Sequence, residues 1–98
     1  MTPAPAERLD KWLWFARFCK TRSQAQGLIE RGLVAIGGRA ATKTSAAVRI
    51  GDEIRIVVGP LARTVIVRDL GGRRGPAAEA RALYTEPGPA ERLIAGAI

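Results

Sequence analysis

The stretch that decides the fold runs from residue 8 to residue 31 and reads RLDKWLWFARFCKTRSQAQGLIER. Its apolar side chains recur at the spacing of one buried helical face. This spacing predicts two short helices joined at residues 19–21, with buried positions Leu9, Trp12, Leu13, Ala16, Ala25, Leu28 and Ile29. Thr21 and Gln24 have the spacing of a capping box for the second helix. Gly32 stands where a C′ glycine would end that helix.

Beyond the helix pair, the sequence alternates between short apolar runs and glycine turns. The runs predict strands at residues 33–36, 39–42, 53–58 and 63–70. Gly37-Gly38 and Gly51-Asp52 mark tight turns between these strands. Pro76 is placed to begin a short helix over residues 77–84. We therefore predict an α+β fold, in which two helices pack on a small, mostly antiparallel sheet with a short C-terminal helix.

Positive charge is concentrated in the first half of the chain. The 98 residues include 16 Lys plus Arg and 9 Asp plus Glu, which gives a formal net charge of +7. Residues 1–50 hold nine basic and three acidic side chains, whereas residues 51–98 hold seven and six. The excess belongs to the helix pair and the first hairpin, as expected for a localised face that binds a polyanion such as nucleic acid.

Several classes of function lack the residues that they need. The chain has no histidine and a single cysteine, Cys19, which excludes an internal disulfide and the commonest metal ligand. No nucleophile motif, phosphate loop or paired-carboxylate spacing occurs. We expect Asp10, the most tempting acid, to form a salt bridge or a cap near the start of the first helix. The prediction is a protein without catalytic activity, cofactor or metal.

The basic and hydroxyl side chains near the helix junction are the candidate binding residues. Free N–H groups and the positive dipole end of the second helix favour a phosphate there. Helical periodicity places Phe15 on the side of the first helix that carries the basic residues, away from the buried face. We predict contacts to nucleic acid from Arg8, Lys11, Arg17, Lys20, Thr21, Arg22, Ser23, Gln24, Arg39 and Lys43. Arg73 and Arg74 lie in a glycine-flanked loop and are candidates for a secondary contact or for simple solvation.

Two aromatic residues of the first helix have two interpretations. Trp14 and Phe18 project away from Leu9 by the helical period. They could be stacking platforms for unpaired bases, or they could bury a second side of the helix. The core interpretation is favoured, because the chain has only five aromatic side chains from which to build a small core.

The same segments resemble a known family. RLDKWL, the basic end of the first helix, TRSQA, GLVAIGG and GDEI resemble the RNA-binding domain named after small-subunit ribosomal protein four. RLDKWLW, ARF and KTR, followed by TVIV and PAAEARALYTE, are similar to the bacterial ribosome-associated heat-shock protein 15 family. Gly37 departs from the domain, which usually has Asn before the hairpin glycine. We expect this change to leave the turn intact.

The resemblance implies how the chain is divided and what it binds. It implies an RNA-binding domain at residues 8–58, extended by a strand and a helix at 59–86, with a flexible N-terminus at 1–7 and a tail at 87–98. It further implies binding to the free large ribosomal subunit that carries a stalled nascent chain on tRNA. Such a protein would aid rescue or recycling of the subunit, in translation quality control and the heat-shock stress response.

The residues themselves predict less than the resemblance does. They predict a protein that binds structured ribosomal or transfer RNA, mainly through phosphates and groove shape. Without a secretory signal or a membrane span, we expect a cytoplasmic protein with no membrane partner, and we expect a monomer. The alternatives are an RNA-targeting module of an RNA-modifying enzyme complex and a general DNA- or RNA-binding protein.

Overall fold

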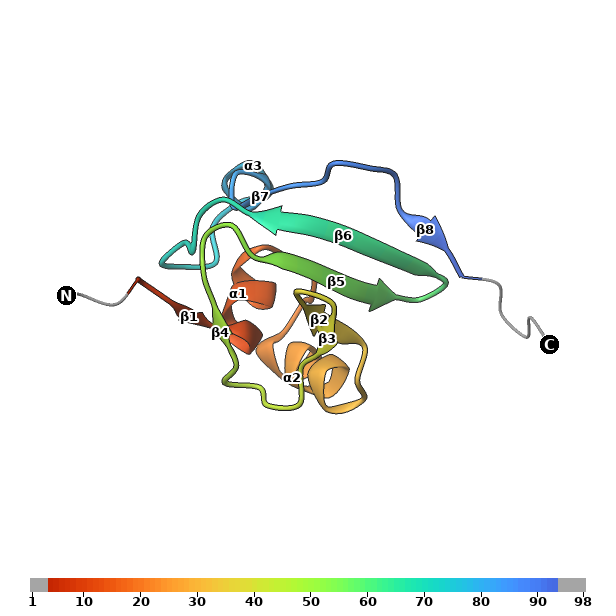
Figure 1. Ribbon diagram of the computed structural model, residues 1–98. Coiled ribbons are helices and arrows are strands. Elements are labelled where there is room, and N and C mark those ends of the chain that lie inside the picture. Colours follow the sequence, from red (N-terminus) through yellow and green to blue (C-terminus); the bar gives the residue numbers. More distant parts are fainter. Residues whose placement is uncertain (1–3, 94–98) are drawn as a thin grey trace.

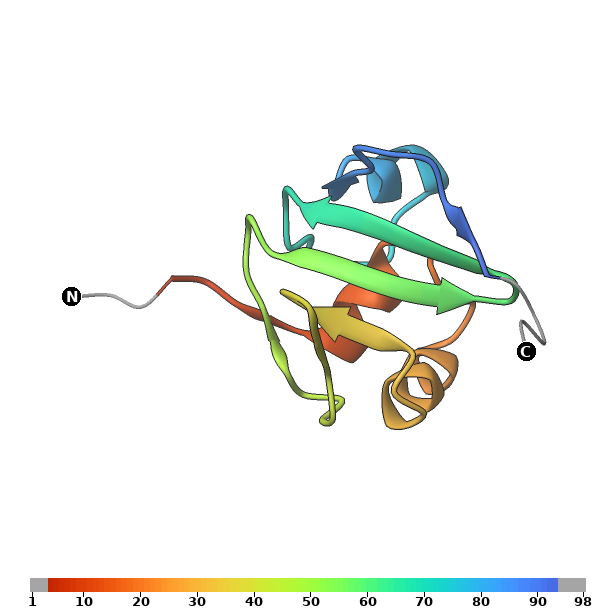
Figure 2. The same cartoon turned by 45° about the vertical axis from the view of Figure 1, so that its right-hand side comes forward.

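Two helices cover one face of a small antiparallel sheet (Figures 1 and 2). The computed structural model describes residues 4–93. The helices are α1 (Leu9–Phe15), α2 (Arg22–Glu30) and α3 (Ala77–Arg81). The strands are β1 (Glu7–Arg8), β2 (Val34–Ile36), β3 (Arg39–Ala40), β4 (Ala47–Val48), β5 (Glu53–Val58), β6 (Leu61–Val67), β7 (Tyr84–Thr85) and β8 (Glu91–Arg92). This architecture confirms the predicted α+β fold.

The main sheet is built around the long hairpin of β5 and β6. Its strand order is β3-β2-β5-β6-β7, and β8 also pairs with β6, at the end away from β7. Each of these pairings is antiparallel, and Ile54 lies opposite Val65 in the central pair. β1 and β4 form a separate ribbon, after which the amides of Leu9 and Asp10 donate to carbonyls of residues 44–46. The 44–48 segment therefore lies against the start of α1.

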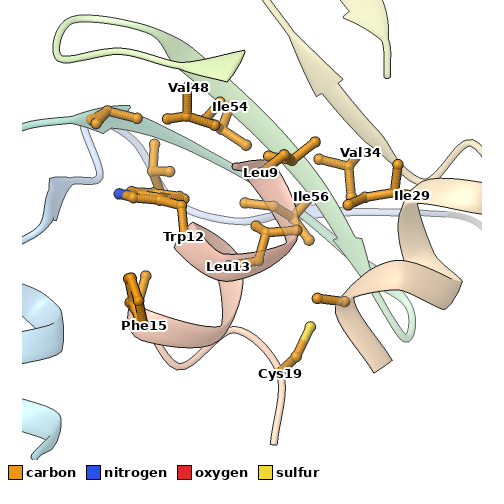
Figure 3. Close-up of a cluster of buried hydrophobic side chains, with 14 of the residues drawn as sticks. Leu9, Trp12, Leu13, Phe15, Cys19, Ile29, Val34, Val48, Ile54 and Ile56 are labelled. Atoms are coloured by element: carbon orange, nitrogen blue, oxygen red, sulfur yellow. The ribbon is translucent and has the colours of Figure 1, made fainter. Parts of the chain in front are cut away.

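The core lies between the helix pair and the inner face of the sheet. Leu9, Trp12 and Leu13 of α1 are 0% exposed, and in Figure 3 they point toward the strand that carries Ile54 and Ile56. The helical period of 3.6 and the strand period of 2 bring these two stripes together. All seven helix positions that were predicted to be buried belong to this core or pack on its edge.

Both helices end in a Schellman motif, although only one has glycine at the left-handed position. At the end of α2, Gly32 has a φ of 75° and ends the helix as predicted. At the end of α1, Arg17 takes that position with a φ of 62°, and the amide of Phe18 donates to the Leu13 carbonyl at 3.0 Å. This left-handed turn stops α1 early, so the connection to α2 covers residues 16–21 and not only 19–21.

The C-terminal part differs most from the predicted elements. The helix predicted to reach residue 84 ends at Arg81, and Tyr84 lies in β7 opposite Val67. Pairing with β6 overrides helical periodicity here, because it places the Tyr84 ring 4.9 Å from that of Phe18. Pro76 is the N-cap of α3 and not its first helical residue. The strands predicted at 39–42 and 63–70 are observed at 39–40 and 61–67.

Regular structure extends beyond the predicted limits of the domain at both ends. Glu7 belongs to β1, and Glu91 and Arg92 form β8. Residues 1–3 of the predicted N-terminal segment and residues 94–98 of the predicted tail lie outside the described residues. Among residues 4–93, no helix is long and apolar enough to cross a membrane.

Candidate nucleic-acid interface

A buried carboxylate organises the basic side chains at the start of the two helices. Asp10 is 0% exposed and accepts hydrogen bonds from Arg8 Nε (3.0 Å), Arg22 Nε (3.2 Å) and Gln26 Nε2 (3.0 Å). The Lys11 amide donates a further bond at 2.8 Å. Burial alone raises the pKa of Asp10, but these hydrogen bonds together outweigh it and lower the pKa to about 2. The two ion pairs confirm the predicted structural role of Asp10.

The Asp10 cluster, formed by Asp10, Arg8, Arg22 and Gln26, fixes two arginines while leaving positive charge in excess. The Arg8 and Arg22 side chains are 43% and 37% exposed, so both reach the surface. Arg8 uses both Nε and Nη2 on the carboxylate, whereas Arg22 donates only Nε. Within residues 4–93, the Nη groups of Arg22 have no internal acceptor and remain free for a ligand. A guanidinium held in this way loses little side-chain entropy on binding.

The first turn of α2 adds hydrogen-bond donors next to this cluster. Thr21 Oγ1 accepts from the Gln24 amide at 3.1 Å, which confirms Thr21 as the N-cap. Gln24 Oε1 accepts from the Lys20 amide at 2.9 Å, so the second bond of the box goes to Lys20 and not to Thr21. The side chains of Lys20, Thr21, Ser23 and Gln24 are all exposed. The helix start thus offers hydroxyls, a cation and a positive dipole end to an anion.

The polar residues of α2 lie on two flanks of the helix, and one of them, Gln26, was not among the predicted binding residues. Arg22 and Gln26 face α1 and contact Asp10. The other flank borders a groove of about 660 Å³. The groove is lined by Phe18, Cys19, Lys20, Ser23, Gln24, Gly27, Leu28, Arg31, Val58 and Gly59. Lys20 and Ser23 thus belong to the groove side, although Ser23 directly follows Arg22 of the Asp10 cluster in the sequence.

The hairpin residues are separated from one another by the fold. Lys43 is exposed in the loop whose Thr44 carbonyl accepts from the Asp10 amide at 3.1 Å. This bond places Lys43 near the Asp10 cluster. Arg39 is also exposed, but it lies on β3 at the outer edge of the sheet. The structure therefore brings the loop that carries Lys43 next to the start of α1, whereas Arg39 lies on the edge strand of the sheet.

The prediction that Phe15 accompanies the basic residues on an outer side of α1 is wrong. Phe15 is 7% exposed and belongs to the core cluster together with Leu83. The C-terminal part of the chain covers this side of the helix, and periodicity within α1 cannot reveal that cover. Lys11 is half-buried on the remaining outer side.

The structure supports the core interpretation for Phe18. Its ring centroid lies 6.0 Å from that of Trp12, and the Arg63 guanidinium lies 4.8 Å from it. Arg63 is itself fixed by Glu86, with Nη2 2.8 Å from Oε1. Trp14 is half-buried and packs on the edge of the core. Stacking platforms for bases are therefore not needed to explain Phe18.

Three predicted arginines lie at the far end of α1, away from the Asp10 cluster. Arg17 Nε donates to the Gly75 carbonyl at 2.8 Å. Arg74 Nη2 lies 3.5 Å from the Cys19 carbonyl. Arg73 Nη2 donates to Glu79 at 2.8 Å, so its charge is offset. Apart from Arg39 on the sheet edge, the predicted set thus falls into one group at the start of the helices and another at the end of α1.

The helix pair, the hairpin that follows it and their sequence define a class of protein. Residues 7–54 match the S4 domain, which covers α1, α2 and the strands through the start of β5. The S4 domain match does not include β6 and α3, which follow it in the chain.

The similarity to three known proteins extends beyond this domain. The chain is 45% identical over 84 residues to heat shock protein 15 of Escherichia coli (strain K12), covering 86% of this chain and 62% of that protein. It is 45% identical over 89 residues to the heat shock protein 15 homolog of Aeromonas salmonicida. The trimeric structure of Vibrio cholerae heat shock protein 15 matches with a TM-score of 0.79 and 44% identity, over 84% of this chain and 82% of that one. The chain belongs to the heat shock protein 15 family, although it spans only 62% of the E. coli protein's length.

Proposed function

We propose that this protein binds structured RNA without catalysing a reaction on it, and that the Asp10 cluster is the centre of the interface. The observation that carries this proposal is the buried carboxylate of Asp10, which fixes Arg8 and Arg22 beside the first turn of α2. Within the described residues, Arg22 keeps both Nη groups free and can grip a phosphate with two parallel hydrogen bonds, and Arg8 adds a fixed positive charge beside it. The phosphate backbone and groove shape of an RNA helix are the features that such a surface can recognise.

Family membership supports a more specific role. We propose that the RNA is ribosomal, and that the protein binds the free large ribosomal subunit carrying a stalled nascent chain on tRNA. It would there aid rescue or recycling of the subunit, in the cytoplasm and under heat stress. The S4 domain and the similarity to heat shock protein 15 support this role. Sedimentation of a cell lysate tests it, because the protein should then travel with free large subunits.

The salt dependence of affinity tests the RNA interface itself. With about five to seven phosphates contacted, the logarithm of the binding constant should fall by about 0.7 to 0.9 per contact for each tenfold increase in salt. Titration of large-subunit rRNA at several KCl concentrations measures this slope. A slope shallower than about −2 would rule out an interface with many phosphate contacts.

Two alternatives lead to different results in the same assays. A general nucleic-acid-binding protein should bind duplex DNA as tightly as structured RNA at physiological salt. We expect this protein to bind structured RNA more tightly than duplex DNA when the two compete. An RNA-targeting module should travel with a modifying enzyme and not with ribosomal subunits. The monomer predicted from the sequence stays a prediction, and equilibrium sedimentation tests it against the trimer described for the Vibrio cholerae relative.

A further inference from the structure

The C-terminal part of the chain builds a second cationic cluster at the end of α1. The loop between β6 and α3 crosses this end of the helix and lies beside it in Figure 1. Three side chain to backbone hydrogen bonds hold it there: Trp12 Nε1 to Asp69 O at 3.0 Å, Arg17 Nε to Gly75 O at 2.8 Å, and Arg74 Nη2 to Cys19 O at 3.5 Å. The last two bonds run in opposite directions: Arg17 reaches the carbonyl of the residue after Arg74, and Arg74 reaches a carbonyl two residues from Arg17.

Neither of these two arginines is neutralised by an acid. Across residues 4–93, the ion pairs involve other basic side chains and leave out Arg17 and Arg74. Glu79 lies near the loop, but both of its oxygens accept from Arg73 Nη2, at 2.8 and 3.1 Å. Asp69 Oδ1 accepts from the Gly71 amide at 3.0 Å. The two guanidinium groups therefore keep their full charge.

Most of the donors of this pair are unused. A guanidinium carries five N–H donors, and each of the two arginines makes one hydrogen bond to a neutral carbonyl. The Arg74 bond, at 3.5 Å, is at the limit of hydrogen-bonding distance, and its buried Nε has no partner within the described chain. A buried donor without an acceptor is unfavourable and uncommon in folded proteins. Arg74 is therefore short of an acceptor.

The backbone at Arg17 is a separate sign that the side chain has a use. Arg17 has a φ of 62°, in a region where glycine is the usual residue at a helix end. A side chain in this conformation is unfavourable, and Arg17 is exposed, so apolar burial does not compensate for it. Strained positions of this kind concentrate at functional sites.

We propose that Arg17 and Arg74 together hold one phosphate group of the bound RNA. Trp14 supports this site, because its ring lies 5.9 Å from the Arg74 guanidinium and limits how that group can turn. The proposal rests on the RNA-binding function and adds a second contact to it. α1 has seven residues, so the two contacts are about 10 Å apart along its axis, within reach of one RNA segment. The S4 domain match ends at residue 54, so Arg74 comes from outside the matched domain.

The experiment compares three variants of the full chain with one matched control. Arg17→Gly removes the guanidinium and suits the left-handed backbone, whereas Arg74→Gln removes the charge and keeps a donor for the Cys19 carbonyl. Each should weaken binding to large-subunit rRNA about tenfold. Because one phosphate is shared, the double variant should lose much less than the product of the two effects. Its salt slope should be shallower by about 0.7 to 0.9, the value for a single phosphate.

The control is Arg68→Gln, since Arg68 is an exposed arginine of the same C-terminal part that bonds Thr85 instead of the loop. Its affinity should stay within about twofold of the wild type. Melting curves for all variants separate binding from folding. The proposal is overturned if Arg17→Gly and Arg74→Gln lower the melting temperature but leave the affinity unchanged, because the arginines would then only hold the loop. It is also overturned if their effects on affinity multiply.

The failure of this site and the failure of the main interface are distinguishable. If Arg22→Ala weakens RNA binding while Arg17→Gly and Arg74→Gln do not, only the second phosphate site is wrong. If none of the three variants weakens binding, the proposed RNA-binding function itself is wrong.

Discussion

The two ends of α1 hold their arginines in opposite ways. At its start, Arg8 and Arg22 share the buried carboxylate of Asp10, at 3.0 and 3.2 Å. At its end, Arg17 and Arg74 donate only to main-chain carbonyls. The first pair is therefore part of the folded structure and has a fixed geometry. The second pair keeps more charge but is held by weaker bonds.

This difference shows that exposure and charge do not by themselves identify a binding residue. The Arg73 side chain is 73% exposed, yet its ion pair with Glu79 leaves little net charge for a ligand. Arg22 is only 37% exposed, yet its fixed orientation and free Nη groups make it the better candidate. The internal partner of each arginine decides which role it can play.

The largest effect on stability should come from a substitution in the core, which supports both ends of α1. Leu13 is 0% exposed between the sheet and α2, so Leu13→Ala should cost about 2–5 kcal/mol of unfolding free energy through the cavity it leaves. In a domain of this size that lowers the melting temperature by roughly 10 °C or more. Thermal melting followed by circular dichroism measures the loss. RNA binding at both ends should disappear together with the fold.

Lys11→Ala is the matched control on the same helix. Lys11 lies on the outer side of α1, half-buried, and makes no ion pair within residues 4–93. Its removal should leave the melting temperature nearly unchanged and weaken RNA binding. If Lys11→Ala melts as early as Leu13→Ala, the division of α1 into a buried and a binding side is wrong.

The next effect concerns only the start of α1, where the stability contributed by Asp10 depends on pH. Asp10 has a pKa of about 2 in the folded protein and about 3.8 when unfolded, so its ionised form stabilises the fold by about 2 kcal/mol above pH 4. This contribution is lost as the pH falls from about 4 to 2, because the carboxylate becomes protonated. Urea unfolding of the wild type and Asp10→Asn over this range measures it. The stability difference between them should shrink toward low pH, and a constant difference would contradict the ion pairs.

The sequence predicted those features of the fold that depend on residues close together in the chain. The stripe of Leu9, Trp12 and Leu13 follows from helical periodicity, and the Thr21 cap and the Gly32 stop follow from residues within one turn. The helix predicted to reach residue 84 failed for the opposite reason. Tyr84 joins the sheet through β6, and no pattern within the local segment reports that pairing.

The candidate site was predicted as a set of residues but not as an arrangement. Arg22 and Gln26 lie 12 and 16 residues from Asp10, and only the packing of α2 on α1 brings them to its carboxylate. Gln26 was missed for this reason, although it lies one helical turn from Arg22 on the same flank. The left-handed turn at Arg17 was missed as well, because glycine is the usual signal for it.

A smaller effect compares the arginines directly. Arg22→Lys keeps the charge but loses the planar fork, so RNA binding should weaken, and Arg22→Ala should weaken it further, by about 1–3 kcal/mol. Arg73→Ala should cost less, because Glu79 already offsets its charge. Titration against large-subunit rRNA at one fixed salt concentration ranks the three variants. If Arg73→Ala costs more than Arg22→Ala, the interface lies on the other side of the molecule.

The central claim is that Asp10 acts by fixing its arginines, and Asp10→Asn tests it most directly. This variant raises the formal net charge from +7 to +8, which by long-range attraction alone should tighten RNA binding. Glu91→Gln is the matched control, because it makes the same charge change at a side chain that is 72% exposed. Both are titrated with large-subunit rRNA below their melting temperatures. We predict that Asp10→Asn binds about tenfold more weakly, equivalent to about 1.4 kcal/mol, while Glu91→Gln binds as well as the wild type or better. Equal or tighter binding by Asp10→Asn would contradict the claim.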